Sequence, residues 1–494
     1  MDMFLLGIDI GTSSIKVAIV EANTGKTLVT VQYPDSETPI NALQLGWAEQ
    51  NPNSWWEHVQ QAILKANASK KYNPQDIVSI GIAYQMHGLV LVDKDQQVLR
   101  DSIIWCDSRA VEIGNKAFHT IGEEKCLSHL LNSPGNFTAS KLAWVKENEP
   151  AIFEKIDKIM LPGDFISMKL TGHITTSIAA LSEGVFWDFK NKEISKDVLN
   201  YFGFDNSIFP TIQEVFSNHG NLDKTIASSL GLKEGIPVAY KAGDQPNNAL
   251  SLNVFSPGEV AATAGTSGVI YGVGDSLHFD KASRINQFAH VNYTKNLDRL
   301  GMLLCINGTG IMNSWAKKWI GDSNDYAKMN EAASAIAIGS EGLQVLPFGN
   351  GAERIFNNKM IGAHLLNLNL NQHGAAHIYR AVQEGIAFAF RFGLDIMREN
   401  GIIPKVIRAG NANLFKSKIF TEAFVNTLNV PVELYDVDGS VGAAKAGGMG
   451  AGIYTSSKEA FQHFIPIQNI EPTSSKQYDE LYQQWLVSLK KLFK

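Results

Sequence analysis

The chain has 494 residues, 45% of them hydrophobic, and a formal net charge of −6 from 43 basic and 49 acidic residues. The length predicts two domains of about 200 to 250 residues each, and the balanced charge, without a basic tract, argues against a nucleic-acid partner. Three cysteines, no secretory signal and no apolar run of about 20 residues predict a soluble cytoplasmic protein with reduced thiols and no membrane partner.

Alternating apolar residues at the start of the chain predict two strands, residues 5–10 and 15–20, joined by the turn Gly-Thr-Ser-Ser at 11–14. Asp9 precedes this turn on the strand face with the least bulk. A polar hairpin turn would explain these residues, and so would a phosphate site, because hydroxyls and backbone N–H groups can surround an anion. In the second interpretation Asp9 holds a metal ion through water.

Further strands and helices alternate through the first half, which is typical of an α/β fold. We expect Asn53 or Ser54 to be the N-cap of a helix at 51–66, and Trp55 and Trp56 to be packing residues. Asp107 and Arg109 could form an ion pair or have a functional role. The expected elements are a strand at 28–33, a helix at 51–66, a strand at 76–88 that ends in Gln-Met-His-Gly, a strand at 98–110, a helix at 140–150, a strand at 158–162 with a turn at 163–164, and a strand, turn and helix at 235–251.

The stretch VAATAGTSGVIYGVG at 260–274 repeats the Gly-Thr-Ser motif about half a chain length after the first copy. The repeat favours a duplicated domain, and we place the two domains at 1–253 and 254–494. Two such hairpins would face one polyphosphate. Downstream, the pattern predicts a strand, loop and helix at 404–428, a small-residue helix at 438–452 that another backbone or a nucleotide approaches closely, and an amphipathic terminal helix on the surface around Tyr478 to Leu489.

Together these motifs resemble those of the FGGY carbohydrate kinases, over roughly residues 4 to 454. The stretches 85–88, 104–109 and 137–145 (QMHG, IWCDSR and FTASKLAWV) are similar to the xylulokinase branch of that family. The resemblance implies an α/β fold of two ribonuclease-H-like ATPase domains, of the actin and hexokinase type, with a cleft between them. ATP and a sugar would meet in this cleft, whose closure excludes water.

The resemblance also implies the site residues. Asp244 is the expected general base, and Asp9 the expected second acid, near Mg²⁺ and bound to it through water. Met86 and His87, with Gln245, would contact the sugar, and the loop 350–354 would lie near the cleft. The residues expected to bind ATP are Gly11, Thr12, Ser13, Gly265, Thr266, Ser267, Gly268, Gly410 and Asn413.

Three positions depart from the family pattern. The loop at 408–414 reads RAGNANL and lacks two usual glycines, while Cys106 and Gln245 stand where the branch carries Asn. We therefore expect ATP-dependent phosphorylation of a ketopentose, with D-xylulose favoured and its 5-hydroxyl as acceptor. The alternatives are ribulose, gluconate or a polyol as substrate, or a nucleotide-binding protein without kinase activity. A homodimer is a further expectation from the resemblance.

Overall fold

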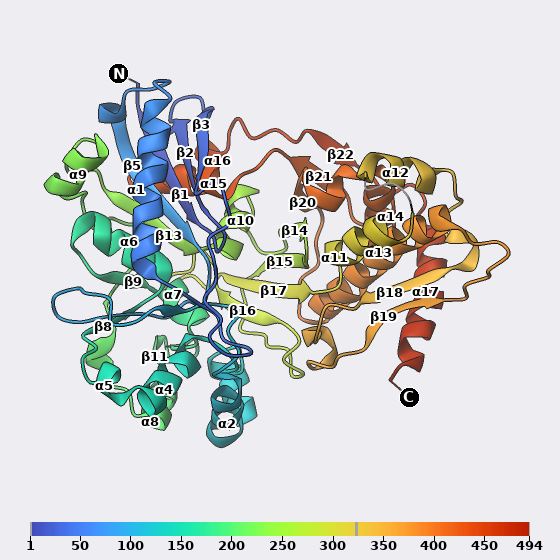
Figure 1. Ribbon diagram of the computed structural model, residues 1–494, viewed down its shortest axis with the longest axis horizontal. Coiled ribbons are helices and arrows are strands. Elements are labelled where there is room, and N and C mark those ends of the chain that lie inside the picture. Colours follow the sequence, from blue (N-terminus) through green and yellow to red (C-terminus); the bar gives the residue numbers. More distant parts are fainter. Residues whose placement is uncertain (1, 322–324, 494) are drawn as a thin grey trace.

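The computed structural model describes residues 2–321 and 325–493. Two mixed sheets, each with its own helices, lie side by side (Figure 1). The first sheet contains β1 (Phe4–Ile10), β2 (Ile15–Glu21), β3 (Thr27–Tyr33), β5 (Ile77–Tyr84) and β13 (Val238–Gly243). The second contains β14 (Val260–Ala264), β15 (Gly268–Gly274), β16 (Asn286–Ala289), β17 (Leu300–Ile306), β20 (Ile407–Gly410), β21 (Val432–Tyr435) and β22 (Gln468–Ile470).

Five strands of the two sheets follow the same order. In the first sheet β1, β2 and β3 form an antiparallel meander, β5 runs parallel to β1, and β13 runs parallel to β5. In the second sheet β14, β15 and β17 form the meander, β20 runs parallel to β14, and β21 parallel to β20. This repeated topology agrees with the duplication that the two Gly-Thr-Ser motifs predict, and it confirms the α/β class.

The remaining elements surround these sheets. The longer helices are α1 (Pro52–Ala68), α2 (Val111–Ile121), α4 (Thr138–Asn148), α6 (Pro162–Thr171), α10 (Asp244–Ser251), α11 (Gly310–Trp319), α12 (Tyr326–Ser334), α13 (Ala375–Glu399), α14 (Lys418–Leu428), α15 (Gly439–Gly450) and α17 (Ser475–Lys491). Shorter helices are α3 (Glu123–His129), α5 (Pro150–Phe153), α7 (Ile178–Glu183), α8 (Lys196–Phe202), α9 (Lys224–Leu230) and α16 (Ser457–Ala460). Short strands are β4 (Glu49–Gln50), β6 (Val90–Val92), β7 (Ser102–Ile103), β8 (Lys158–Met160), β9 (Thr175–Ser177), β10 (Trp187–Asp188), β11 (Glu193–Ile194), β12 (Thr211–Gln213), β18 (Gln344–Phe348) and β19 (Gly362–Leu366).

Three local predictions are wrong. The N-cap of α1 is Asn51, whose side chain accepts a hydrogen bond from the backbone N–H of Asn53, because Pro52 fits the first helical position. The predicted turn at 163–164 lies inside the first turn of α6, which Pro162 begins. The predicted strand at 98–110 is reduced to β7, because the Asp107 carboxylate accepts backbone N–H groups from neighbouring segments and bends the chain after residue 103.

At the boundary, one helix from each half packs against the other half. Helix α15 follows β21 of the second sheet, yet it packs on the first sheet, where a Cβ on Gly7 or on Gly81 would lie within 2.0 Å of an α15 carbonyl oxygen. Helix α10 follows β13 of the first sheet, and its Ala249 shares an apolar cluster with Ala261 and Tyr271 of the second. The predicted small-residue helix therefore has a packing reason, a close backbone approach. The domain division at residue 253 stays a prediction.

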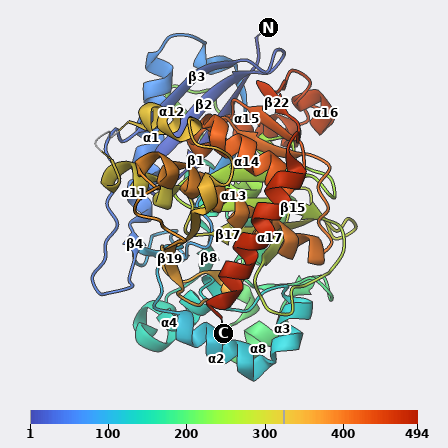
Figure 2. The ribbon, with the colours of Figure 1, turned by 90° about the vertical axis from the view of Figure 1, so that its right-hand side faces the viewer.

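The terminal helix α17 crosses the outer face of the second half (Figure 2). As predicted it is amphipathic, but its apolar side is deeply buried: Tyr478 and Trp485 are fully covered, and the Trp485 indole donates to the Val345 carbonyl at 2.8 Å. Trp55 is likewise a core residue, as the sequence predicts. Within the described ranges, no helix has both the length and the apolar character that a bilayer crossing requires.

Candidate active site

The turn at 85–88 lies at the end of β5 and holds Met86 and His87, the two residues predicted to contact the sugar. We call it the sugar turn. Met86 is buried and packs against Gly243, where a Cβ would lie 2.6 Å from Met86 Cγ. His87 Nδ1 lies 3.0 Å from the Glu183 carbonyl oxygen, so Nδ1 donates and Nε2 is left as an acceptor. Burial, with a smaller contribution from the charge of Lys141, lowers the pKa of His87 to about 3. His87 is therefore a neutral hydrogen-bond acceptor at physiological pH.

Asp244 occupies the first position of α10, directly after Gly243, which packs against Met86 of the sugar turn, and its charge acts on Glu183. Burial raises the pKa of Asp244 to about 7, with a further contribution from the charge of Asp9, while hydrogen bonds from Gln245 oppose the shift. A carboxyl group with a pKa near 7 is suited to accept a proton at neutral pH. Gln245, a predicted sugar contact, thus directs hydrogen bonds to Asp244.

Asp9 lies at the end of β1, beside the N-terminus of α15. A Cβ on Gly439 would lie 2.5 Å from its Oδ2, and Asp438, the N-cap of α15, pairs with Lys16 at 3.4 Å. Burial raises the pKa of Asp9 to about 6, the charge of Asp438 adds to this shift, and Lys16 opposes it. Two carboxyl groups and one lysine therefore meet where the first hairpin faces α15.

Glu183 is a buried acid that the sequence analysis did not single out. It ends α7, is 2% exposed, and its Oε1 lies 3.5 Å from the His87 backbone nitrogen. A Cβ on Gly243 would lie 2.6 Å from its Oε2, so its carboxyl group borders both the sugar turn and Asp244. Burial raises the pKa of Glu183 well above its usual value. No local pattern marks this residue, because its contacts are distant in sequence.

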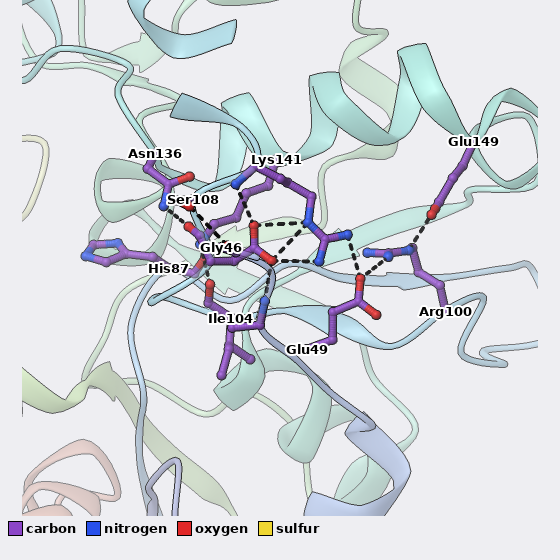
Figure 3. A network of polar contacts seen from close by, with 12 residues as sticks. Gly46, Glu49, His87, Arg100, Ile104, Ser108, Asn136, Lys141 and Glu149 are labelled. Atoms are coloured by element: carbon purple, nitrogen blue, oxygen red, sulfur yellow. Dashed lines mark hydrogen bonds and ion pairs between the residues drawn. The ribbon is translucent and has the colours of Figure 1, made fainter. Parts of the chain in front are cut away.

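A network of polar contacts lies behind the sugar turn (Figure 3). Asp107 and Arg109, left open between an ion pair and a functional role, form a bidentate ion pair that is almost fully buried. Arg109 also pairs with Glu49 at 2.6 Å, and its guanidinium lies 3.7 Å from the centre of the Trp47 ring. The backbone N–H of Ala48 donates to Asp107 Oδ2 at 2.6 Å. This network fixes the segment 104–109 behind the sugar turn, and we call this segment the rigid wall.

The first hairpin turn is bound to that wall and to the sugar turn. Thr12 Oγ1 donates to Gln85 Oε1 at 3.1 Å and accepts from the Trp105 indole at 3.0 Å, while its carbonyl accepts from Gln50 at 2.8 Å. Gly11 closes the turn through its N–H to the Ser14 carbonyl, and Ser13 is exposed. Because both hydroxyl contacts of Thr12 are to protein groups, the exposed Ser13 and the backbone of the turn are left to face an anion.

The second hairpin turn borders a cavity of about 580 Å³. Three predicted ATP residues, Gly265, Thr266 and Asn413, line it, together with α11, α12 and the loop after β20. Gly410 lines an adjoining cavity of about 140 Å³, which reaches Asp438 and Gly439 and so leads toward Asp9. Ser267 lies beside Cys305, and the space next to Gly268 is filled by Phe390 and Thr309. Packing therefore accounts for Gly268.

The amide of Asn313 contributes to the wall of the larger cavity. Asn313 of α11 is 6% exposed and lines the cavity, and its Oδ1 is buried without a hydrogen-bond partner in the described part of the chain. A buried polar atom without a partner is destabilising unless a bound group satisfies it. The exposed Asn413, which follows β20, lines the same cavity. Asn313 is therefore a cavity-lining residue that sequence reasoning missed.

The loop at 350–354 reaches the boundary between the halves. The Glu353 carboxylate accepts the N–H groups of Asn307 and Gly308, both at 3.0 Å, and Arg354 lies close enough to lower the pKa of His87. Phe288 of the second sheet packs on the His87 ring at 5.4 Å between ring centres. Residues of the second half therefore complete the wall around the sugar turn.

A magnesium ion fits this site only together with a nucleotide. Within residues 2–321 and 325–493 no group of three or more His, Cys, Asp or Glu side chains could hold a metal ion by itself. Asp9 offers one carboxylate, and Mg²⁺ commonly binds one or two carboxylates, substrate phosphates and water. The chain's donors are compatible with Mg²⁺ held mainly by phosphate oxygens.

Comparison with known proteins gives a consistent result. Models of the N-terminal and C-terminal domains of the FGGY family of carbohydrate kinases match residues 4–251 and 260–451. A xylulose kinase of Bacillus subtilis is 28% identical over 469 residues, 94% of this chain and 91% of that protein. The crystal structure of xylulose kinase from Rhodospirillum rubrum has a TM-score of 0.88 at 23% identity, over 99% of both chains. The gluconate kinase structure from Lactobacillus acidophilus has a TM-score of 0.89 at 20% identity, over 100% of this chain and 98% of that one.

Proposed function

The chain belongs to the FGGY family of carbohydrate kinases and is an ATP-dependent sugar kinase, and we propose that it transfers the γ-phosphoryl group of ATP to the 5-hydroxyl of D-xylulose. The observation that carries the choice of substrate is the turn at 85–88 beside Asp244. Met86 offers an apolar surface for sugar carbons, and His87 Nε2 accepts a hydrogen bond from a hydroxyl. The relatives named xylulose kinase support the same choice.

Asp244 acts as the general base in this proposal. A sugar hydroxyl becomes a nucleophile as its proton leaves, and a carboxylate within hydrogen-bond reach can take that proton. The pKa of Asp244, raised by burial to about 7, makes the carboxylate a stronger base than an exposed aspartate. The proton moves from the 5-hydroxyl to Asp244 as the oxygen bonds to the γ-phosphorus and the bond to ADP breaks.

The two hairpins would bind the nucleotide from opposite sides. The larger cavity receives the nucleoside, with Thr266, Asn413 and Asn313 as contacts, and the turn at 11–13 meets the far end of the phosphate chain. Bound Mg²⁺ would neutralise phosphate charge in the transition state. Asp9 would hold the ion through water, and Lys16 would balance the negative charge of the neighbouring Asp438.

A coupled assay of ADP release over a panel of ketopentoses, polyols and sugar acids tests the proposal. We expect the highest kcat/KM with D-xylulose, and dependence on both ATP and the sugar. No turnover with any ketose would contradict the proposal. ADP release that is the same with and without added sugar would instead indicate a nucleotide-binding protein with no sugar kinase activity.

Gluconate is the second candidate, because the gluconate kinase structure superposes on this chain as well as the xylulose kinase structures do. The ionised Asp244 that the proposal requires would repel an anionic sugar, which favours a neutral substrate; Glu183 adds little to this repulsion because burial disfavours its ionised form. Gluconate in the panel decides between them, since a higher kcat/KM for gluconate than for D-xylulose would reverse this choice.

A further inference from the structure

His87 has a backbone conformation that its side chain does not favour. Its φ is 63°, in the left-handed region, which residues other than glycine rarely adopt. Such a conformation persists only where the surrounding structure determines it, and it is concentrated at functional sites. The direction of the His87 ring, and so of Nε2, depends on this backbone conformation. The groups that bind the His87 backbone therefore control a sugar contact.

The carbonyl of His87 has two donors, and both come from α4. Lys141 Nζ donates to it at 2.9 Å, and Thr138 Oγ1 donates at 3.3 Å. The Lys141 side chain is 0% exposed, and its Nζ also donates to the Ile104 carbonyl at 3.0 Å. Burial lowers the pKa of Lys141 to about 7. Even the neutral amine has two N–H donors, so both carbonyls are satisfied in either protonation state.

The second carbonyl belongs to the rigid wall described above. Ile104 is the first residue of the segment 104–109, which Asp107, Arg109 and Glu49 fix through buried ion pairs (Figure 3). The Asp107 backbone N–H donates to the same Ile104 carbonyl at 3.2 Å. Lys141 thus connects the sugar turn to a segment that cannot easily move. A tether of this kind fixes the position of His87 because its far end is itself fixed.

The connections form a closed ring. Trp105, next to Ile104, donates to Thr12, and Thr12 donates to Gln85, two residues before His87. Lys141 completes the ring from Ile104 back to His87. The ring therefore joins the sugar turn, the first hairpin turn and the segment at 104–105, and Lys141 is the side chain that closes it.

We propose that Lys141 is a positioning residue for the sugar: it holds the His87 backbone in its left-handed conformation and so directs the imidazole to the substrate. This inference rests on the proposed sugar-binding role of His87. Loss of Lys141 would leave the turn free to relax toward more favourable backbone angles and displace Nε2. Sugar binding would weaken, while Asp244 and the nucleotide cavity, which Lys141 does not contact, would keep their function.

The test compares Lys141→Met with Lys146→Met. Lys146 lies on the same helix and also donates to two backbone carbonyls, of Phe202 at 2.7 Å and Gly203 at 2.6 Å, but on the side away from the sugar turn. For Lys141→Met we expect the KM of D-xylulose to rise at least about tenfold, with kcat within about threefold and the KM of ATP within about twofold. For Lys146→Met all three constants should match the wild type within about twofold.

A double-mutant cycle with His87→Ala separates positioning from general structural damage. If Lys141 acts through His87, adding Lys141→Met to His87→Ala should raise the sugar KM by less than about twofold. A full tenfold rise in that background would contradict the proposal. So would an unchanged sugar KM in Lys141→Met when the wild type is active.

Two further outcomes are distinguishable. A wild type without activity on any sugar would contradict the proposed function itself. If Lys141→Met does not fold, Thr138→Val becomes the test, because it removes the weaker hydrogen bond to the same carbonyl; we expect a sugar KM raised about threefold. An unchanged sugar KM in a folded Thr138→Val would then overturn the proposal.

Discussion

The two Gly-Thr-Ser hairpins share a sequence motif and a strand topology but lie in different surroundings. In the first, Thr12 is bound on both sides by protein groups, Gln85 and Trp105, and Asp9 stands directly before the turn. In the second, Thr266 is exposed at the edge of the larger cavity, and its carbonyl accepts the N–H of Ile311. The same local design thus serves a tightly packed turn in one half and an open, cavity-lining turn in the other.

The helices that follow extend the comparison. Helix α10 begins at Asp244 and α15 follows its N-cap Asp438, each after the corresponding strand of its own sheet. Asp244 lies next to the sugar turn, whereas Asp438 caps its helix through the Ser440 N–H and pairs with Lys16. Each helix therefore begins with an acid, but Asp244 is the first helical residue of α10, whereas Asp438 is the N-cap of α15. In the proposed mechanism Asp244 takes the proton, whereas Asp438 has a structural and electrostatic role.

The largest expected effect follows from this assignment. Asp244→Asn keeps the size of the side chain but removes the base, so kcat should fall by about a thousandfold. Because burial already disfavours the ionised form of Asp244, the variant should unfold at the same temperature as the wild type or higher. ADP-release kinetics and thermal unfolding measure both. Asp438→Asn is the matched control, and a larger loss of kcat there would reverse the assignment of the two acids.

The pH dependence should report the same base. With a pKa of about 7, Asp244 is protonated and inactive in acid and ionised above neutrality. The kcat/KM for the sugar should therefore rise about tenfold between pH 6 and pH 8 and then level off. His87, whose pKa lies near 3, does not titrate in this range. A profile that falls with rising pH over this interval would exclude a carboxylate base.

Matched threonine variants sharpen the contrast between the hairpins. Thr12→Val breaks the hydrogen bonds to Gln85 and Trp105, so we expect about a fivefold rise in the sugar KM as well as weaker ATP binding. Thr266→Val should raise only the KM of ATP, because Thr266 lies in the nucleotide cavity away from the sugar turn. Steady-state kinetics with each substrate varied distinguish the two patterns. Identical patterns in both variants would mean that the hairpins are not specialised.

The smallest effect concerns the unpaired amide of the second half. Asn313→Ala should raise the KM of ATP about threefold and leave the sugar KM unchanged, because it removes a hydrogen-bond partner for the nucleoside. The protein without ligand should not lose stability, since Asn313 Oδ1 has no partner in the described residues. Comparison of ATP with GTP as phosphoryl donor shows whether the amide recognises the base. An unchanged KM of ATP would place the nucleoside elsewhere.

Much of this organisation could be predicted from the sequence because its signals are local. The alternating residues around Asp9 and Gly265 predict both hairpins, and Gly243-Asp244 before Pro246 predicts the strand and helix that place the acid. The strand prediction is wrong for residues 104–109 because Asp107 accepts hydrogen bonds from Ala48 and Arg109. Neither contact follows from the alternation of apolar residues.

The buried polar residues of the site could not be found in this way. Glu183 is far along the chain from His87, and Lys141 meets His87 and Ile104 only after folding, so neither has a local signature. On the sequence alone Lys141 is one of two lysines on the predicted helix. Its burial is decided by tertiary packing, and the same holds for Asn313, whose significance comes from the cavity that it lines.

The most direct test of the central claim is a crystal structure with a non-hydrolysable ATP analogue, Mg²⁺ and D-xylulose. The phosphates should lie between the turns at 11–13 and 265–267, with the 5-hydroxyl about 3 Å from the Asp244 carboxylate and a second hydroxyl at His87 Nε2. A sugar bound away from Asp244 in the closed form, or a phosphate chain that touches only one of the two turns, would contradict the account.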